Sequence, residues 1–373
     1  MKNIVKGFVG KLSLKDRIIF ESDGDYCDNT KSLFEYMIKQ GVNNKYQMIW
    51  LVEHPENFEN KSNIKFVNIN EKNFFKKMVY YYYLATAKYG FYSHRNPLFN
   101  LNKNQVFVNL WHGNGPKNPK FLNLGHNFDY VLYSGEYFKP LFVDHLKCRE
   151  EQMLPLGFPR NDLLFMDSHV LNKIQDKKYK KTIMWMPTFR KHKNGHVEFE
   201  KDEKYIYGVP ILREAEQLLK LNNRLESMDI QLIIKLHPMQ DMTHIELHPL
   251  SNIVFMTNNI LKKHDIELYM LLSEMDALVT DYSSVYVDFM LLDKPIGFTI
   301  DDADDYKTGF AFDNILEYMP GHHMSDLNSL ISFFQDMLDE KDPYSEDRAR
   351  LMEGMNFYKS DFSKRILKYF KIN

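Results

Sequence analysis

The stretch of the chain that decides the fold runs from residue 276 to residue 289 and reads Asp276-Ala277-Leu278-Val279-Thr280-Asp281-Tyr282-Ser283-Ser284-Val285-Tyr286-Val287-Asp288-Phe289. Its apolar start predicts a buried strand, and the segment from Val285 to Leu292 predicts a helix. Ser283 and Ser284 would lie at the first turn of this helix, where unpaired backbone N–H groups and the positive dipole end favour a phosphate. Both serines also fit an ordinary N-cap, and this stretch alone leaves the two interpretations open.

Three other segments carry charged or polar side chains where a predicted strand ends, the edge at which open α/β sheets bind ligands. They are Leu110-Trp111-His112-Gly113-Asn114-Gly115-Pro116-Lys117, Met186-Pro187-Thr188-Phe189-Arg190 and Ile233-Ile234-Lys235-Leu236-His237-Pro238. A lone histidine is usually structural. Two histidines at strand ends, with cations and hydroxyls at the others, favour a ligand site.

Apolar and polar segments alternate along the chain as strands and helices do in α/β proteins with parallel sheets. Predicted strands lie at 18–21, 46–52, 89–92, 106–110 and 130–133, and again at 183–186, 231–235, 253–255, 277–280 and 296–299. Predicted helices include 30–40, 73–87, 136–146, 209–221 and 265–272. A lysine-rich stretch at 172–181 separates the two sets, so we predict two Rossmann-like domains, 1–170 and 180–373, with C-terminal helices that can pack back on the first.

The composition excludes several classes of protein. The chain has 373 residues, 44% of them apolar and 26% charged, which is typical of a soluble globular protein of two domains. A net charge of −2 argues against a nucleic-acid-coating protein. Cys27 and Cys148 have no metal-ligand spacing and indicate a reducing compartment. The acidic run 301–305 is interpreted as a solvated loop, and His322-His323 as surface, so no metal site is predicted.

The first fifteen residues combine Ile4, Phe8 and Leu12 with lysines at 2, 6, 11 and 15. Such a segment can lie in an anionic membrane surface, or it can be an ordinary first helix docked on the domain. No run approaches the ~18 apolar residues of a spanning helix. We expect a cytoplasmic protein that is peripheral on the inner face of the membrane. The aromatic segment from Phe74 to Tyr83 is interpreted as a packed helix with a partly exposed face rather than a nucleic-acid platform.

Taken together, the motifs resemble those of the CDP-glycerol glycerophosphotransferase family, the primases and polymerases of teichoic acids and related capsular polymers. In the family's order they are Phe20-Glu21-Ser22, Asp28-Asn29, Trp111-His112-Gly113 with Lys117, Gly157-Phe158-Pro159-Arg160-Asn161-Asp162, Pro187-Thr188-Phe189-Arg190, Lys235-Leu236-His237-Pro238, and Thr280-Asp281-Tyr282-Ser283-Ser284-Val285 with Asp288. The chain departs from the family at Asn114-Gly115-Pro116, where Thr-Pro-Leu is common.

The resemblance implies two domains that face a cleft, as in the B-type glycosyltransferases. It implies transfer of glycerol phosphate, or a related polyol phosphate, from CDP-glycerol to a hydroxyl of a lipid-linked acceptor, with release of CMP and no cofactor. The polyol and the number of units added stay open. A glycosyltransferase that uses a nucleotide sugar, and a non-catalytic membrane-associated scaffold, are the alternative functions.

Each candidate site residue receives a role on this basis. His112 is the expected base, because its glycine-rich surroundings leave room for an acceptor. His237, Lys235, Ser283 and Ser284 are expected to stabilise the pyrophosphate, and Arg160 and Arg190 to add phosphate contacts. Lys117, Asp288 and the Pro187-Thr188 turn complete the predicted substrate-binding set.

Overall fold

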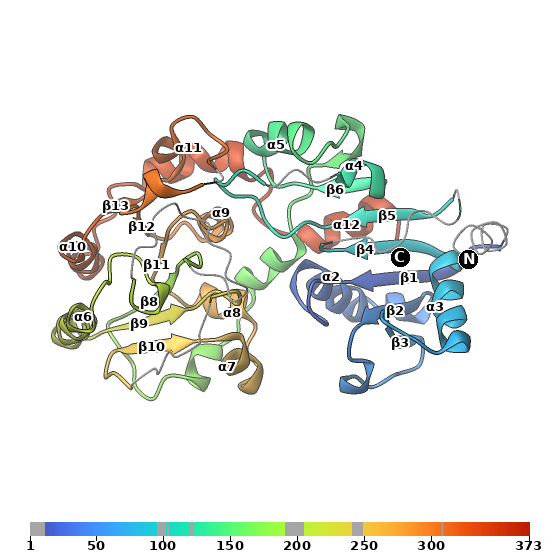
Figure 1. The fold of residues 1–373 in the computed structure, drawn as a ribbon, viewed down its shortest axis with the longest axis horizontal. Helices are drawn as coiled ribbons and strands as arrows, with labels where there is room; N and C mark the ends of the chain where they lie inside the picture. Colours follow the sequence, from blue (N-terminus) through green and yellow to red (C-terminus); the bar gives the residue numbers. More distant parts are fainter. Residues whose placement is uncertain are drawn as a thin grey trace. The chain divides into compact units, whose positions relative to one another are not determined.

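The computed structural model describes residues 12–94, 102, 104–119, 123–190, 205–240, 249–307 and 309–373. These residues form two compact units (Figure 1). Unit 1 contains the described residues up to Gly113, Pro119–Asp162 and Phe357–Asn373, and unit 2 contains Asn114–Asn118 and Leu163–Asn356. The chain therefore changes unit at positions other than the predicted division at 170–180.

Unit 1 is built on a seven-stranded parallel sheet in the order β3-β2-β1-β4-β5-β6-β7. The strands are β1 (Lys15–Glu21), β2 (Gln47–Val52), β3 (Ile64–Asn68), β4 (Ala87–Tyr92), β5 (Val106–Asn109), β6 (Tyr130–Leu132) and β7 (Met153–Leu154). Its helices are α2 (Asp28–Lys39), α3 (Phe74–Thr86), α4 (Leu124–Asn127), α5 (Lys139–Asp144) and α12 (Phe362–Phe370).

Unit 2 is built on a six-stranded parallel sheet in the order β10-β9-β8-β11-β12-β13. The strands are β8 (Lys181–Met186), β9 (Ile230–Lys235), β10 (Ile253–Met256), β11 (Ala277–Thr280), β12 (Ile296–Thr299) and β13 (His322–Met324). Its helices are α6 (Ala215–Met228), α7 (Asn258–Lys263), α8 (Leu268–Ser273), α9 (Val285–Phe289), α10 (Leu327–Leu338) and α11 (Ser345–Met355). Two parallel-sheet units of this kind confirm the predicted α/β fold.

The central strands of unit 2 are the most completely buried, whereas the central strand β1 of unit 1 is exposed at Lys15 and Asp16 and buried from Arg17 onwards. Every residue of β9 and β11 is buried, because helices cover both faces of a parallel sheet. In unit 2, α6 and α10 close one side of the sheet through residues such as Leu221, Leu225 and Phe333. None of the described helices combines the length and the apolar composition that a membrane crossing requires.

Several predicted elements differ from the structure. Strands β3, β7 and β13 were not predicted, since β7 has two residues and β13 begins with two histidines. The helix predicted at 209–221 begins only at Ala215, because Val209, Ile211 and Leu212 pack into the core from irregular backbone. Asp301 and Asp302 are also not part of a solvated loop, since their side chains are only 6% and 2% exposed.

The Gly157–Asp162 motif has a structural task in unit 1, the docking of α12. Gly157 has a positive φ of 70°, and a side chain there would collide with the Phe362 ring. The Asp162 carboxylate accepts hydrogen bonds from the backbone N–H groups of Phe362 and Ser363, at 2.9 and 2.8 Å. Asp361, the residue that precedes the helix, makes no capping bond with its side chain. Asp162 therefore caps α12 from 200 residues away.

Replacing this cap tests the docking of α12. We expect Asp162→Ala to lower the free energy of unfolding of α12 by about 1 kcal/mol, the usual cost of a lost N-cap. Hydrogen exchange of the α12 amides measures it. Asp167→Ala, which removes an exposed aspartate, is the matched control. Equal exchange rates in the two variants would show that the cap does not hold the helix.

Candidate active site

In unit 2, the turns that carry the predicted site residues leave the sheet at one edge. β9, β8 and β11 are parallel neighbours, so their carboxyl ends lie side by side. The turns after them hold His237, Thr188 and Ser283 respectively. The structure thus gathers three of the four predicted strand-end segments at a single sheet edge.

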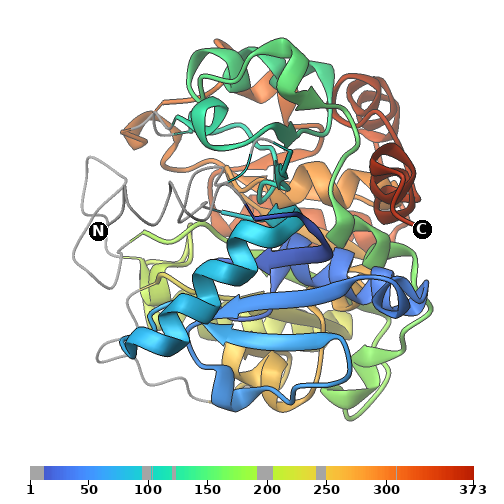
Figure 2. The same cartoon turned by 90° about the vertical axis from the view of Figure 1, so that its right-hand side faces the viewer.

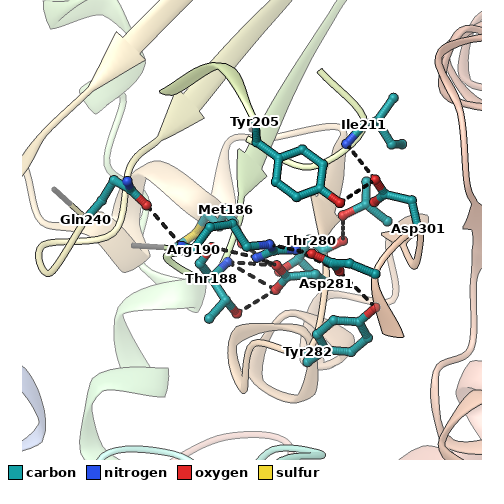
Figure 3. Close-up of polar contacts among 12 residues, drawn as sticks. Met186, Thr188, Arg190, Tyr205, Ile211, Gln240, Thr280, Asp281, Tyr282 and Asp301 are labelled. Atoms are coloured by element: carbon teal, nitrogen blue, oxygen red, sulfur yellow. Dashed lines mark hydrogen bonds and ion pairs between the residues drawn. The ribbon is translucent and has the colours of Figure 1, made fainter. Parts of the chain in front are cut away.

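A buried ion-pair network joins the turns after β8 and β11 to the segment after β12 (Figure 3). Arg190 donates from Nη1 to Asp281 at 2.6 Å and from Nε to Asp302 at 2.7 Å. A further bond from Nη1 reaches the Thr188 carbonyl at 2.7 Å. Asp302 comes from the segment after β12, so one guanidinium holds the ends of β8, β11 and β12. Neither aspartate was among the site residues predicted from the sequence.

The network keeps its charges by mutual compensation. Burial alone would lower the pKa of Arg190, but Asp281 and Asp302 more than offset it and the pKa is raised. Burial would raise the pKa of Asp281, and Arg190 and Lys117 reverse this, so that it is lowered. Burial dominates at Asp302, whose pKa is raised. The Arg190 guanidinium is therefore paired with two carboxylates, and this pairing disfavours the predicted role of Arg190 as a phosphate ligand.

Thr188 and Lys117 extend the network towards the surface. The Thr188 backbone N–H and hydroxyl both donate to Asp281, the hydroxyl at 2.7 Å. Lys117 donates from Nζ to the Thr188 hydroxyl at 3.0 Å. Thr188 is buried, whereas Lys117 is half-exposed. Lys117 is consequently the member of the set that presents a cation near solvent.

The Asn114–Asn118 segment lies against the serine turn of unit 2. Its Pro116 carbonyl accepts a hydrogen bond from the Ala311 N–H at 2.7 Å, and the backbones of Lys117 and Phe310 form an isolated antiparallel β-bridge. A Cβ on Gly115 would lie 2.7 Å from Cα of Ser284. The glycine in the departing Asn114-Gly115-Pro116 sequence is therefore required for this close approach.

Ser283 and Ser284 are half-exposed, and α9 begins directly after them. The side chain of Ser284 makes no capping bond to the helix, which argues against the plain N-cap interpretation. Asp288 lies elsewhere: it is buried, and the Tyr269 hydroxyl donates to its carboxylate at 2.5 Å. Asp288 thus ties α9 to α8 in the structure and does not face the serine turn as a free carboxylate.

His237 and Lys235 share the end of β9. The Met239 N–H donates to Nδ1 of His237 at 3.1 Å, so the neutral ring carries its proton on Nε2 and can donate from there. The Phe189 ring lies 5.0 Å from the imidazole. Lys235 is buried behind it, and burial lowers its pKa to about 8.

In unit 1, the backbone around His112 is held in an unusual conformation. Trp111 has a positive φ of 56°, which is uncommon for a residue of this size. Asn29 donates to its carbonyl at 2.9 Å, and its N–H donates to Asn109 at 2.7 Å. Arg160 donates to the His112 carbonyl at 3.0 Å and pairs with Asp28 at 2.7 Å. This frame turns the chain after β5 so that His112 is exposed.

The His112 ring stays neutral at pH 7. Although His112 reaches solvent, the protein packed around its ring desolvates it and lowers its pKa to about 4, with His94 and Arg160 acting in the same direction and Asp28 opposing them. The exposed His94 ring is 5.5 Å from that of His112. His94 follows β4 by two positions, a strand-end placement that was the one available sequence signal and was missed.

The predicted residues therefore fall into two layers. His112, His237, Lys117, Arg160, Ser283 and Ser284 keep contact with solvent, whereas Pro187, Thr188, Arg190, Lys235 and Asp288 are buried. Among the described residues, no cluster of His, Cys, Asp and Glu side chains could hold a metal ion.

The ion-pair network predicts a large effect of Arg190→Ala. Removing one partner of a buried pair leaves uncompensated charge, so we expect a loss of about 3–5 kcal/mol in the free energy of unfolding of β8 and β11. Hydrogen exchange of their amides measures it. Arg350→Ala breaks an exposed pair with Asp347 and should cost less than about 1 kcal/mol. Similar losses in both variants would contradict the role of the network.

Comparison with solved structures shows that the fold is similar to that of the wall teichoic acid polymerase TagF. The TM-score is 0.77 at 24% identity, covering 100% of this chain and 94% of that one. Another structure of this polymerase comes from a CDPG soak. At this identity the likeness shows the fold alone.

Relatives by sequence include a teichoic acid poly(glycerol phosphate) polymerase of Staphylococcus epidermidis, 27% identical over 82% of this chain and 43% of that protein. A teichoic acid ribitol-phosphate primase of Bacillus spizizenii is 29% identical over 61% and 60%. A teichoic acid glycerol-phosphate transferase of Staphylococcus aureus is 27% identical over 91% and 89%. The chain spans less than two thirds of the first two relatives. Because the family profile matches residues 8–370, the chain belongs to the CDP-glycerol:poly(glycerophosphate) glycerophosphotransferase family.

Proposed function

We propose that the protein transfers glycerol phosphate, or a related polyol phosphate, from CDP-glycerol to a hydroxyl of a lipid-linked acceptor and releases CMP. The reaction would serve teichoic acid or capsular polysaccharide biosynthesis. The observation that carries the proposal is the set of solvent-facing donors on one sheet edge of unit 2, Ser283, Ser284 and His237, in a chain of this family.

Unit 2 would bind the donor through its solvent-facing layer. The His237 Nε2–H and the serine hydroxyls are preorganised to donate to the pyrophosphate as charge builds on the leaving CMP. The buried Arg190 network would act as a positioning device that keeps these turns fixed. Lys117 and the buried Lys235 ammonium would add positive charge at the same edge.

The acceptor step would use unit 1. The acceptor oxygen forms a bond to the phosphorus that carries glycerol, the bond from that phosphorus to the bridging oxygen breaks, and CMP leaves with the electron pair. A neutral His112 can take the acceptor proton, since its pKa of about 4 leaves it unprotonated at pH 7. Arg160 would hold the His112 backbone in place through its bond to the carbonyl.

The acceptor and the location complete the proposal. A lipid-linked acceptor requires the protein to work at a membrane surface, and we propose a peripheral position on its inner face. The N-terminal segment that suggested this in the sequence includes residues 1–11, which lie outside the described residues.

Alanine variants of the two histidines should show which residue serves donor binding and which serves the chemical step. We expect His112→Ala and His237→Ala each to lower CMP release by at least ~10²-fold, the low end for a positioned acid–base group. Calorimetry should show weaker CDP-glycerol binding for His237→Ala and near-normal binding for His112→Ala. The exposed His54 and His323 supply control alanine variants in units 1 and 2. Normal turnover by His112→Ala would refute the base, and UDP release from a UDP-sugar would favour the glycosyltransferase alternative.

The pH dependence of kcat/KM should show two limbs. Activity should fall below about pH 4, where His112 becomes protonated, and above about pH 8, where Lys235 loses its charge. Lys235→Met should abolish the alkaline limb and lower the rate at pH 7. If the alkaline limb persists in Lys235→Met, the titration of another group must cause it.

At alkaline pH, the free energy of unfolding should rise while the activity falls. The pKa of Lys235 is about 8 in the folded protein against an ordinary value of 10.5. The unfolded chain therefore binds more protons between these values, and the free energy of unfolding should rise with pH across that window. Urea unfolding at several pH values measures this, with Lys235→Met as the variant in which the rise is reduced.

A further inference from the structure

Helix α3 of unit 1 carries an apolar face that the described residues leave uncovered. Five of its large apolar side chains are exposed: Phe74 63%, Phe75 77%, Met78 43%, Val79 47% and Tyr82 36%. Figure 2 shows the helix lying across the front of the sheet of unit 1. Exposed apolar side chains that form one contiguous patch mark interaction sites, whereas scattered ones are ordinary.

The five side chains form a single stripe. At 3.6 residues per turn, their positions fall within roughly 140° of the helix surface. Tyr80 and Leu84, on the other side, are buried and attach the second half of the helix to the unit. Around the first turns every residue from Phe74 to Val79 is exposed. The stripe is thus not the helix's core-facing side.

The helix begins in an ordered way although its first turns have little packing. Asn73 caps it by accepting hydrogen bonds from the N–H groups of Phe75 and Lys76, at 3.0 and 3.2 Å. Glu71 accepts from the Asn73 N–H at 2.8 Å. The cap presents the Phe74 and Phe75 rings from a formed helix, so a partner would not have to fold it.

Cations flank the stripe. Lys76 and Lys77 lie about 130° to either side of its middle, at 3.6 residues per turn. At the far end, the exposed Lys15 lies 5.3 Å from the Tyr82 ring centroid. An apolar centre with basic flanks suits an anionic lipid surface, since lysine stems can reach headgroups while the rings enter the interface.

The same arrangement fits other occupants poorly. Lysine is depleted at protein–protein interfaces, which disfavours a protein partner. A second copy on this face would bring the lysines of both helices together, at a cost in repulsion. We therefore propose that the α3 stripe, Phe74, Phe75, Met78, Val79 and Tyr82, docks unit 1 on an anionic lipid surface, with Lys76 and Lys77 at the headgroups. This rests on the membrane location proposed above and names the surface that makes the contact.

Vesicle co-sedimentation of the full chain tests the proposal. The probes are vesicles of phosphatidylglycerol with phosphatidylcholine, and vesicles of phosphatidylcholine alone. We expect Phe74→Ser with Phe75→Ser to lower partitioning on anionic vesicles by at least ~10-fold, since two large apolar side chains leave the interface. Lys76→Gln with Lys77→Gln should lower it by about five-fold per lysine and reduce its salt dependence. Wild type should prefer the anionic vesicles.

A matched pair of exposed apolar residues lies in unit 2, Phe165 at 48% and Met166 at 43%. Phe165→Ser with Met166→Ser should partition like wild type. Equal partitioning of the α3 and control variants, or no binding by wild type, would overturn the proposal. So would a wild-type dimer, seen by analytical ultracentrifugation without lipid, that the α3 serine variant dissociates. Calorimetry should show unchanged CDP-glycerol binding by the α3 variants. Donor binding therefore tests the transferase proposal, and vesicle partitioning tests the membrane-docking proposal independently of it.

Discussion

The constraint on which unit 2 depends is the buried pairing of Arg190 with Asp281 and Asp302. A guanidinium and two carboxylates away from water are costly unless each compensates the others. Their joint position fixes the ends of three strands, β8, β11 and β12. The Thr188 turn and the serine turn are therefore set by electrostatics as much as by packing, and Lys117 brings further positive charge to the group.

The two-layer arrangement of the motif residues follows from this constraint. Side chains that face solvent, such as His237 and Ser284, can touch a substrate, whereas buried ones such as Arg190 and Asp288 hold the elements in place. A motif records both kinds of residue without distinguishing them. Asp162 is a further example, because this residue of the Gly157–Asp162 motif caps a distant helix.

Much of the fold could be predicted from the sequence, because buried parallel strands are continuous apolar runs of distinctive composition. Strands without that signal, such as β13 with its two histidines, could not. The site was predictable where a polar residue follows a strand, as His112 and His237 do. The partners of Arg190 were not, since Asp302 is 112 positions away and only the folded sheet brings it near. His94 also follows a strand, β4, and that signal was overlooked; its closeness to His112, by contrast, depends on the fold, because the two residues follow different strands.

A crystal structure of the complex with CDP-glycerol tests the central claim most directly. The account predicts that pyrophosphate oxygens lie within ~3 Å of the His237 Nε2 and of a hydroxyl of Ser283 or Ser284, the distance of a hydrogen bond. It also predicts that Arg190 keeps both of its aspartate partners when the donor is bound. A pyrophosphate held by the Arg190 guanidinium, with its bonds to Asp281 and Asp302 broken, would contradict it.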